Sequence, residues 1–188
     1  MTKLLILSDS HNSRLAIENI LAAEADSIDA LVFLGDGLRD LEQTLTLYPR
    51  LRAYAVAGNC DFGALEPLDG LAAFDGVVVF YTHGHMYGVK YDLDTLSDAA
   101  AARGANVALF GHTHVPVAEQ RGDVFLFNPG SIGKQFYMDM LQLDEAEFEL
   151  IQRARRGECL YKCGMERYHL EVKAPTHKAV LFGSAGGR

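Results

Sequence analysis

The sequence predicts an α/β fold in which two β-sheets pack face to face with helices outside them. Short apolar runs flanked by Gly and Asp indicate strands that are buried on both faces. Helical patterns lie between the early runs, an alternation that is typical of a parallel sheet. Hairpin signals follow in the second half. One globular domain is expected, because 188 residues with 49% apolar content suit a single packed core.

Five apolar runs are expected to form the strands that precede the polar motifs. They are residues 4–7, 31–34, 54–57, 77–81 and 107–110. Apolar residues at spacings of three and four predict helices after residue 13 and over residues 38–45. A further helix is expected over residues 93–103, where Gly104 would end it.

The second half carries antiparallel signals. Asp75-Gly76 between two apolar runs is typical of a hairpin turn, and a polar turn separates residues 115–118 from 124–127. Further strand-like segments are expected at 136–143 and 148–151. The pattern then weakens. We therefore expect a domain over residues 1–151 and, over 152–188, a peripheral C-terminal extension of the same domain with a frayed tail. A partner-binding arm is the alternative.

Charge excludes one class of partner. The formal net charge is −8, and 17 Lys and Arg against 25 acidic residues leave no basic stripe for long nucleic acid. A small phosphate substrate stays compatible with this charge, because two bound dications would reverse the local field.

The cysteines and the apolar runs indicate the cellular compartment in which the protein is expected. The three cysteines, Cys60, Cys159 and Cys163, form no framework spacing, which indicates a reducing compartment. The run at residues 4–7 is too short for a signal peptide, and no stretch approaches the length of a membrane span. A cytoplasmic protein without a membrane partner is expected.

Five polar segments carry the candidate chemistry, and each directly follows a predicted strand. Successive segments are 23 to 29 residues apart, about one strand and its return connection. We expect all five at one sheet edge, where ligands bind in open α/β sheets. Residues two apart, such as Asp9 and His11, would share a face if the chain were extended. The segments are Asp9-Ser10-His11, Gly35-Asp36, Gly58-Asn59-Cys60-Asp61, His83-Gly84-His85 and Gly111-His112-Thr113-His114.

These residue types predict a metal site. Carboxylate, imidazole and carboxamide ligands suit Mn²⁺, Fe or Zn²⁺, and one carboxylate can bridge two ions roughly 3.5–4 Å apart. Any single segment is weak evidence, since a lone histidine such as His83 is more often an ordinary structural residue. Five segments in order, each after a strand, make coincidence a poor explanation.

The combined pattern Asp-x-His, Gly-Asp, Gly-Asn, His-Gly and Gly-His-x-His resembles that of the calcineurin-like metallophosphoesterase superfamily, over about residues 1–150. The short length, the Gly58–Asp61 segment and Asn128-Pro129-Gly130-Ser131 resemble its small YfcE-type phosphodiesterase branch. The resemblance implies the metallophosphoesterase fold: a four-layer αββα sandwich of two mixed β-sheets flanked by helices.

The resemblance also implies a dinuclear site with one ligand set for each ion. Asp9, His11 and His114 would hold one ion, and Asn59, His83 and His112 the other. Asp36 would bridge two divalent ions, expected to be Mn²⁺, with Fe, Ni²⁺, Zn²⁺ or Mg²⁺ as alternatives. The implied reaction is in-line attack on phosphorus by a metal-bridging hydroxide.

Two departures from the pattern bear on the substrate. Cys60 stands where larger members have a histidine, and a thiol with an ordinary pKa of about 8.5 is a poor substitute for a cationic imidazole. This favours diesters, whose single negative charge needs less help. Close relatives often place an Arg after the Asn-Pro-Gly-Ser segment, and whether Lys134 replaces it is open.

The leading hypothesis is hydrolysis of a small phosphodiester. Asp36, Asn59, Cys60 and His85 are the residues expected to act at the reacting phosphate, with His85 either supporting the ligands or touching the substrate. The alternatives are a phosphomonoesterase acting on a metabolite or phosphoprotein, and a non-catalytic scaffold such as a retromer subunit of this fold. By analogy with relatives of this size, a homodimer or homotetramer is expected.

Overall fold

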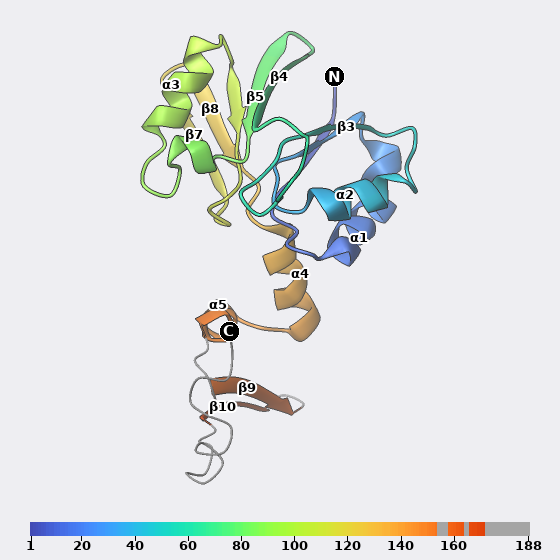
Figure 1. The fold of residues 1–188 in the computed structure, drawn as a ribbon, viewed down its shortest axis with the longest axis vertical. Coiled ribbons are helices and arrows are strands. Elements are labelled where there is room, and N and C mark those ends of the chain that lie inside the picture. Colours follow the sequence, from blue (N-terminus) through green and yellow to red (C-terminus); the bar gives the residue numbers. More distant parts are fainter. Residues whose placement is uncertain (154–157, 164–165, 172–188) are drawn as a thin grey trace. The chain divides into compact units, whose positions relative to one another are not determined.

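The computed structural model describes residues 1–153, 158–163 and 166–171. The chain divides into two compact units between Phe136 and Tyr137. The first unit contains both predicted sheets and all five polar segments (Figure 1). The predicted domain boundary at residue 151 stays a prediction.

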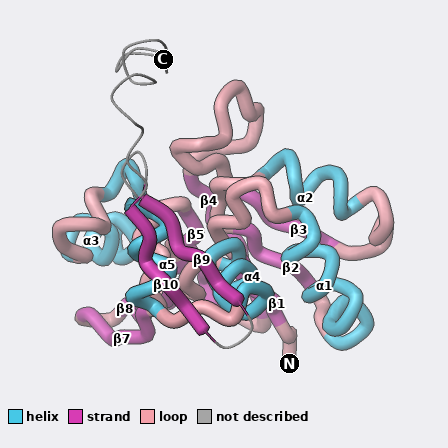
Figure 2. The backbone as a smooth tube through the Cα atoms, turned by 90° about the horizontal axis from the view of Figure 1, so that it is seen from below, coloured by secondary structure: helices cyan, strands magenta, loops and turns pink. Residues whose placement is uncertain are grey.

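The first sheet is three-stranded and parallel, in the order β1-β2-β3. The strands pair in register, so that Leu7, Phe33 and Ala55 end them at one edge. Helices α1 and α2 lie on the same side of this sheet (Figure 2). The bounds are β1 Leu4–Leu7, α1 Arg14–Glu24, a 3-10 turn η1 Ala25–Ser27, β2 Ala30–Phe33, α2 Leu38–Leu45 and β3 Arg52–Ala55.

The second sheet is five-stranded and mixed, in the order β4-β5-β6-β8-β7. Strands β5, β6 and β8 are parallel, and the edge strands β4 and β7 are antiparallel to their neighbours. The predicted hairpin turn at Asp75-Gly76 is confirmed, with the left-handed φ that such turns use at both residues. The bounds are β4 Asp69–Phe74, β5 Val77–Thr82, a 3-10 turn η2 His85–Tyr87, α3 Asp94–Ala102, β6 Val107–Leu109, β7 Val117–Arg121 and β8 Val124–Asn128.

Three apolar layers separate these elements, and both faces of the central strands are buried as predicted. One layer joins α1 and α2 to the first sheet, one lies between the sheets, and one joins α3 to the second sheet. They contain, respectively, Ile17 with Leu31, Val32 with Val79, and Leu96 with Phe80. The order helix, sheet, sheet, helix confirms the four-layer αββα sandwich.

Two details of the predicted fold are wrong. Only the second sheet is mixed, because the first is parallel throughout. The five polar segments also do not share one sheet edge: three follow strands of the first sheet, and two follow β5 and β6 of the second. Spacing along the chain carries no information about which sheet a strand joins.

The segments expected as strands after residue 136 are helices, α4 Ile132–Leu141 and α5 Glu145–Arg153. Short apolar runs fit a buried strand or a helix equally well. A capping box precedes α5, because Asp144 and Glu147 each accept the other's backbone N–H. Strands β9 Glu158–Cys163 and β10 Glu166–Glu171 then form an antiparallel pair, and the expected frayed tail lies outside the described residues. In the described part of the chain, no helix has the length and apolar character to cross a bilayer.

Candidate metal centre

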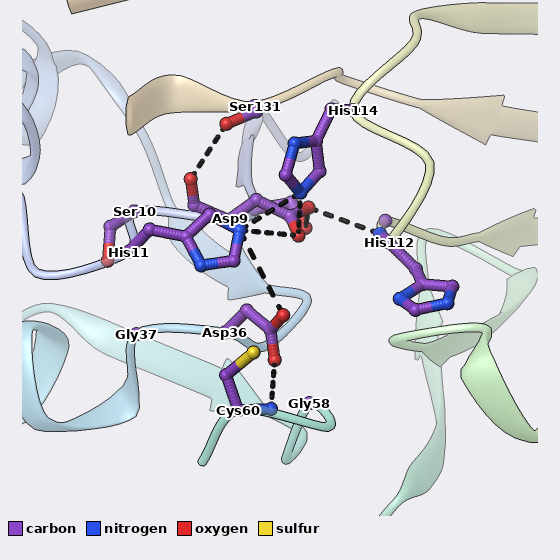
Figure 3. A network of polar contacts seen from close by, with 12 residues as sticks. Asp9, Ser10, His11, Asp36, Gly37, Gly58, Cys60, His112, His114 and Ser131 are labelled. Carbon is purple, nitrogen blue, oxygen red and sulfur yellow. Dashed lines mark hydrogen bonds and ion pairs between the residues drawn. The ribbon is translucent and has the colours of Figure 1, made fainter. Parts of the chain in front are cut away.

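All seven predicted ligands converge where strands of the two sheets end. Asp9 and His11 follow β1, and Asp36 and Asn59 follow β2 and β3. His83, His112 and His114 come from the second sheet, after β5 and β6. Figure 3 shows His11, Asp36 and His114 around the carboxylate of Asp9, with His112 to one side.

The first cluster consists of Asp9, His11 and His114. Oδ1 of Asp9 lies 3.6 Å from Nε2 of His11 and 3.2 Å from Nε2 of His114, and the two Nε2 atoms are 2.9 Å apart. Asp9 is buried, and its Oδ1 has no hydrogen-bond partner among the described residues. A buried carboxylate oxygen without a donor is costly, and a cation placed among these three atoms would satisfy it.

The second cluster surrounds His83, which is fully buried. Nδ1 of His83 lies 2.7 Å from the carbonyl oxygen of Leu34, which can only accept, so the proton of the neutral ring sits on Nδ1. Nε2 then lies 3.1 Å from Oδ1 of Asn59 and 3.2 Å from Nδ1 of His112. Ligand atoms that converge in this way also suit a cation.

Asp36 lies between the two clusters. Its Oδ2 is 4.0 Å from Nε2 of His11 and 3.4 Å from Nε2 of His83. Its Oδ1 instead accepts the backbone N–H of Cys60 at 2.7 Å, which fixes the carboxylate plane. One carboxylate oxygen therefore faces both clusters, the placement that a bridging ligand requires.

The ionisation of these groups suits cation binding. Burial raises the pKa of Asp9, but the imidazoles of His11 and His114 outweigh it and hold the pKa well below its usual range. Burial also raises the pKa of Asp36, but the imidazole of His83 and the backbone N–H of Cys60 outweigh burial and lower this pKa to about 2. At neutral pH both carboxylates are ionised.

His112 is a neutral imidazole at neutral pH. Burial, followed by the positive charge of Lys90, lowers its pKa to about 4. Its ring nitrogen therefore keeps a lone pair that can bind a metal.

The backbone of the site is strained. Five of the predicted ligands have left-handed φ angles, from 47° to 66°, which are uncommon outside glycine and cluster at functional sites. The expected extended geometry of the residue pairs two apart is therefore wrong, and their side chains converge through tight turns instead. The five are Asp9, His11, Asp36, His112 and His114.

Two glycines leave room for the carboxylate of Asp36. A Cβ on Gly58 would lie 2.1 Å from Oδ1 of Asp36. A Cβ on Gly35, whose φ is +92°, would lie 2.6 Å from the backbone N of Gly58. The loops after β2 and β3 can approach this closely only because both residues lack a side chain.

Asp61, for which the sequence alone indicates no role, holds the same two loops. Its carboxylate accepts the backbone N–H groups of Asp36 at 2.7 Å, Gly37 at 2.8 Å, Leu38 at 2.9 Å and Gly58 at 2.9 Å. The sequence offers one hint of this role, because Gly37 directly precedes α2. A glycine has no side chain that could accept the first N–H groups of a helix, so a residue from elsewhere in the chain must accept them.

The Asn128–Ser131 segment supports the loops from both sheets. Asn128 Nδ2 donates to the carbonyl oxygen of Gly111 at 2.9 Å, beside His112. Ser131 Oγ donates to the carbonyl oxygen of Asp9 at 2.9 Å, a contact visible in Figure 3. The Asn128–Ser131 segment therefore connects the turn that carries Asp9, after the first sheet, with the turn that carries His112, after the second.

Cys60 and His85 lie beside the clusters. Sγ of Cys60 forms a compact group with ligand atoms of His11 and Asp36, all within 4.8 Å of one another. Although the residue is exposed, desolvation and the carboxylate of Asp36 raise the pKa of its thiol to about 11. The ring centroid of His85 is 5.4 Å from that of His83. Burial lowers the pKa of His85. Its buried Nδ1 has no hydrogen-bond partner in the described part of the chain.

Comparison with known proteins places this site in a family. Residues 2–144 match the calcineurin-like phosphoesterase superfamily domain. The chain is 35% identical over 129 residues to Probable metallophosphoesterase YsnB of Bacillus subtilis, covering 68% of this chain and 73% of YsnB. It is 35% identical over 154 residues to Phosphodiesterase YfcE of Escherichia coli strain K12, covering 70% and 80%. The crystal structure of a predicted phosphoesterase from Streptococcus pneumoniae superposes with a TM-score of 0.63 at 29% identity, over 71% of this chain and 74% of that one. This chain therefore belongs to the calcineurin-like phosphoesterase superfamily.

Proposed function

We propose that the chain is a dinuclear metal-dependent phosphodiesterase that hydrolyses a small phosphodiester. The observation that carries the proposal is the position of Asp36 Oδ2, which faces ligand atoms of two separate clusters. In this assignment Asp36 would bind both ions. The first ion would be held by Asp9, His11 and His114, and the second by Asn59, His83 and His112.

We propose Mn²⁺ as the metal. The seven ligands offer oxygen and imidazole nitrogen only, a set that suits Mn²⁺. The proposed set contains no thiolate, the ligand type that would favour Zn²⁺. Metal analysis of the loaded protein would separate Mn²⁺ from Fe, Ni²⁺, Zn²⁺ and Mg²⁺.

The residues of the chain divide the chemical work among them. Divalent ions at this centre would supply polarisation of the phosphate and a lowered pKa for water at the site. Asp9 and Asp36 contribute permanent negative charge that retains the cations, and the Nδ1–H bond to Leu34 keeps the His83 ring in its binding tautomer. We assign His85 a place beside the reacting phosphate, where its low pKa keeps it uncharged.

Cys60 favours a diester over a monoester. A neutral thiol at this position supplies no positive charge to a dianionic phosphate. A diester carries a single negative charge and depends less on such a group. The similarity to YfcE, which is named a phosphodiesterase, supports the same assignment.

Metal stripping and refilling tests the proposal. Chelator-treated protein is expected to be inactive on bis(p-nitrophenyl) phosphate and to regain turnover with Mn²⁺, with a lower kcat/KM on p-nitrophenyl phosphate. The His114→Ala variant is expected to bind about one ion per chain fewer. Turnover that no divalent ion restores would refute the enzyme, and fewer than one ion per chain after loading would support a scaffold.

A further inference from the structure

A cavity of about 570 Å³ opens beside the metal centre. His11, Asp36 and Cys60 line it on the side of the metal centre, and its other walls come from α2 and from residues 61–66 of the loop between β3 and β4. This volume lies within the usual range for small-molecule sites. The phosphate of a substrate at the metal centre could therefore extend one ester group into this cavity.

Two large apolar side chains line the cavity with almost their whole surface uncovered. Phe62 is 92% exposed and Leu65 is 98% exposed. An aromatic ring left in water beside a polar centre is a typical surface for another planar ring, because stacking needs only an exposed π-face.

The loop that presents Phe62 is anchored on both sides of it. Asp61, directly before Phe62, accepts four backbone N–H groups, and the N–H of Ala64 donates to the carbonyl oxygen of Asp61 at 3.2 Å. Ala64 also packs against the apolar layer under α1 and α2. Because these contacts hold the loop in place before a ligand arrives, the entropic cost of binding against the Phe62 ring is reduced.

The charges of the cavity select against highly charged ligands. Asp61 is satisfied by backbone N–H groups, and Asp40 accepts the hydroxyl of Ser10 at 2.8 Å. Together with Arg39, Glu42 and Glu66 they give one cation and four carboxylates away from the ligand clusters, a formal net charge of about −3. An ester group that brought further phosphates into this space would be repelled, whereas an uncharged ring would not.

We propose that this cavity binds an ester group of the substrate that carries an uncharged planar aromatic ring, as a nucleoside carries its base, and that this ring stacks against the ring of Phe62. The phosphate would then face His11 and Asp36 at the metal centre. This inference rests on the proposed phosphodiesterase function and specifies its substrate class as phosphodiesters in which one ester group carries an aromatic ring.

Kinetics with thymidine 5′-(p-nitrophenyl phosphate) test the stacking contact in the metal-loaded protein. Phe62→Ala is expected to raise KM at least about fivefold with kcat little changed, and Phe62→Tyr to keep the wild-type KM. Tyr91→Ala is the matched control, because Tyr91 is 94% exposed and does not line the cavity. A KM within twofold of wild type for Phe62→Ala would overturn the inference.

Fluorescence gives a second readout that needs no turnover. The chain contains no tryptophan, so Phe62→Trp places a single tryptophan in the cavity, and it can be excited at about 295 nm without the chain's eight tyrosines. Thymidine 5′-methyl phosphate is expected to quench it and to leave a Tyr91→Trp variant unchanged. Equal quenching of both variants, or of neither, would count against the site.

The same variants separate the remaining outcomes. If the wild-type protein turns over no diester with any metal, the proposed function fails whatever the fluorescence shows. If turnover is present and Phe62→Ala changes only the sedimentation of the protein, the exposed ring belongs to a contact between copies of the chain, and the inference is wrong.

Discussion

The carboxylate of Asp61 accepts the backbone N–H of Asp36 at 2.7 Å, so a residue outside the ligand set holds the main chain of the proposed bridging ligand. The same carboxylate accepts the N–H groups of Gly37 and Leu38 at the start of α2. The first N–H groups of a helix lack partners within the helix, and a negative charge there also interacts favourably with the helix dipole. Asp61 thus joins the β2 loop, the β3 loop and α2 at one point.

Asp61→Asn is expected to weaken both stability and metal binding. An amide keeps one acceptor oxygen and turns an NH₂ group toward backbone donors, which should lower the free energy of unfolding by about 2 kcal/mol. Displacement of Asp36 should reduce Mn²⁺ affinity by about tenfold or more. Urea unfolding and calorimetric titration measure the two effects. Asp98→Asn on the exposed side of α3 is the control, and an unchanged Mn²⁺ affinity in Asp61→Asn would contradict the role given to Asp61.

Gly58→Ala is expected to abolish metal-dependent turnover while the chain still folds. The added Cβ would overlap the Asp36 carboxylate, which would have to leave its position between the two clusters. We expect at least about a hundredfold loss of kcat/KM and a lower metal content, measured by steady-state kinetics and elemental analysis.

Gly122→Ala separates this effect from ordinary backbone strain. Gly122 has a φ of +54°, and an added Cβ there would meet no atom within 4 Å among the described residues. This variant should lose about 1 kcal/mol of stability and keep its metals and its kcat/KM. Equal losses of activity in the two glycine variants would argue against the steric explanation.

The sequence predicts the five central strands and the polar residues that follow them, because both follow local rules. Buried strands require continuous apolar runs, and the parallel strands end in polar residues where ligands can bind, so Asp9 and Asp36 are found from their positions alone. The partition of these strands into two sheets depends on long-range pairing, which no local pattern encodes. The left-handed backbone at His11 and His114 is equally hidden, because histidine, although enriched in that region, adopts it in only a minority of cases.

The missed features have a common cause. Asp61 acts on backbone groups of two other loops, and the Asn128–Ser131 segment acts on the loops of both sheets, so their roles exist only in the folded chain. The helices α4 and α5 are a different case. Their apolar runs were compatible with strands, but Asp144 and Glu147 form a capping box that is readable in the sequence.

Cys60→His is expected to shift the enzyme toward monoesters. An imidazole at this position could carry positive charge and donate a strong hydrogen bond to a dianionic phosphate, whereas a neutral thiol carries no charge and is only a weak donor. The ratio of kcat/KM for p-nitrophenyl phosphate to that for bis(p-nitrophenyl) phosphate should rise about tenfold. Cys60→Ser is the control and should leave the ratio near the wild-type value. A fall in the ratio for Cys60→His would show that the residue does not set the diester preference.

The hydrogen bond between Tyr87 and Asp69 predicts a pH-dependent contribution to stability. Tyr87 Oη donates to Oδ2 of Asp69 at 2.6 Å, and burial together with that carboxylate raises the pKa of Tyr87 to about 12. The phenol ionises near pH 10 in the unfolded chain, so the unfolded state loses this proton first. Stability from this group is therefore fully present below about pH 10 and is lost as the pH rises toward 12.

Comparison with Tyr87→Phe isolates this contribution from that of other titrating groups. The wild-type protein should exceed the variant by about 1 kcal/mol in free energy of unfolding between pH 7 and 9, a modest value because Asp69 is partly exposed. The difference should shrink steadily above pH 10 in urea unfolding measured up to about pH 11. A difference that grew with pH would mean that the folded protein favours the ionised phenol, which is incompatible with a Tyr87 hydroxyl that donates to the Asp69 carboxylate.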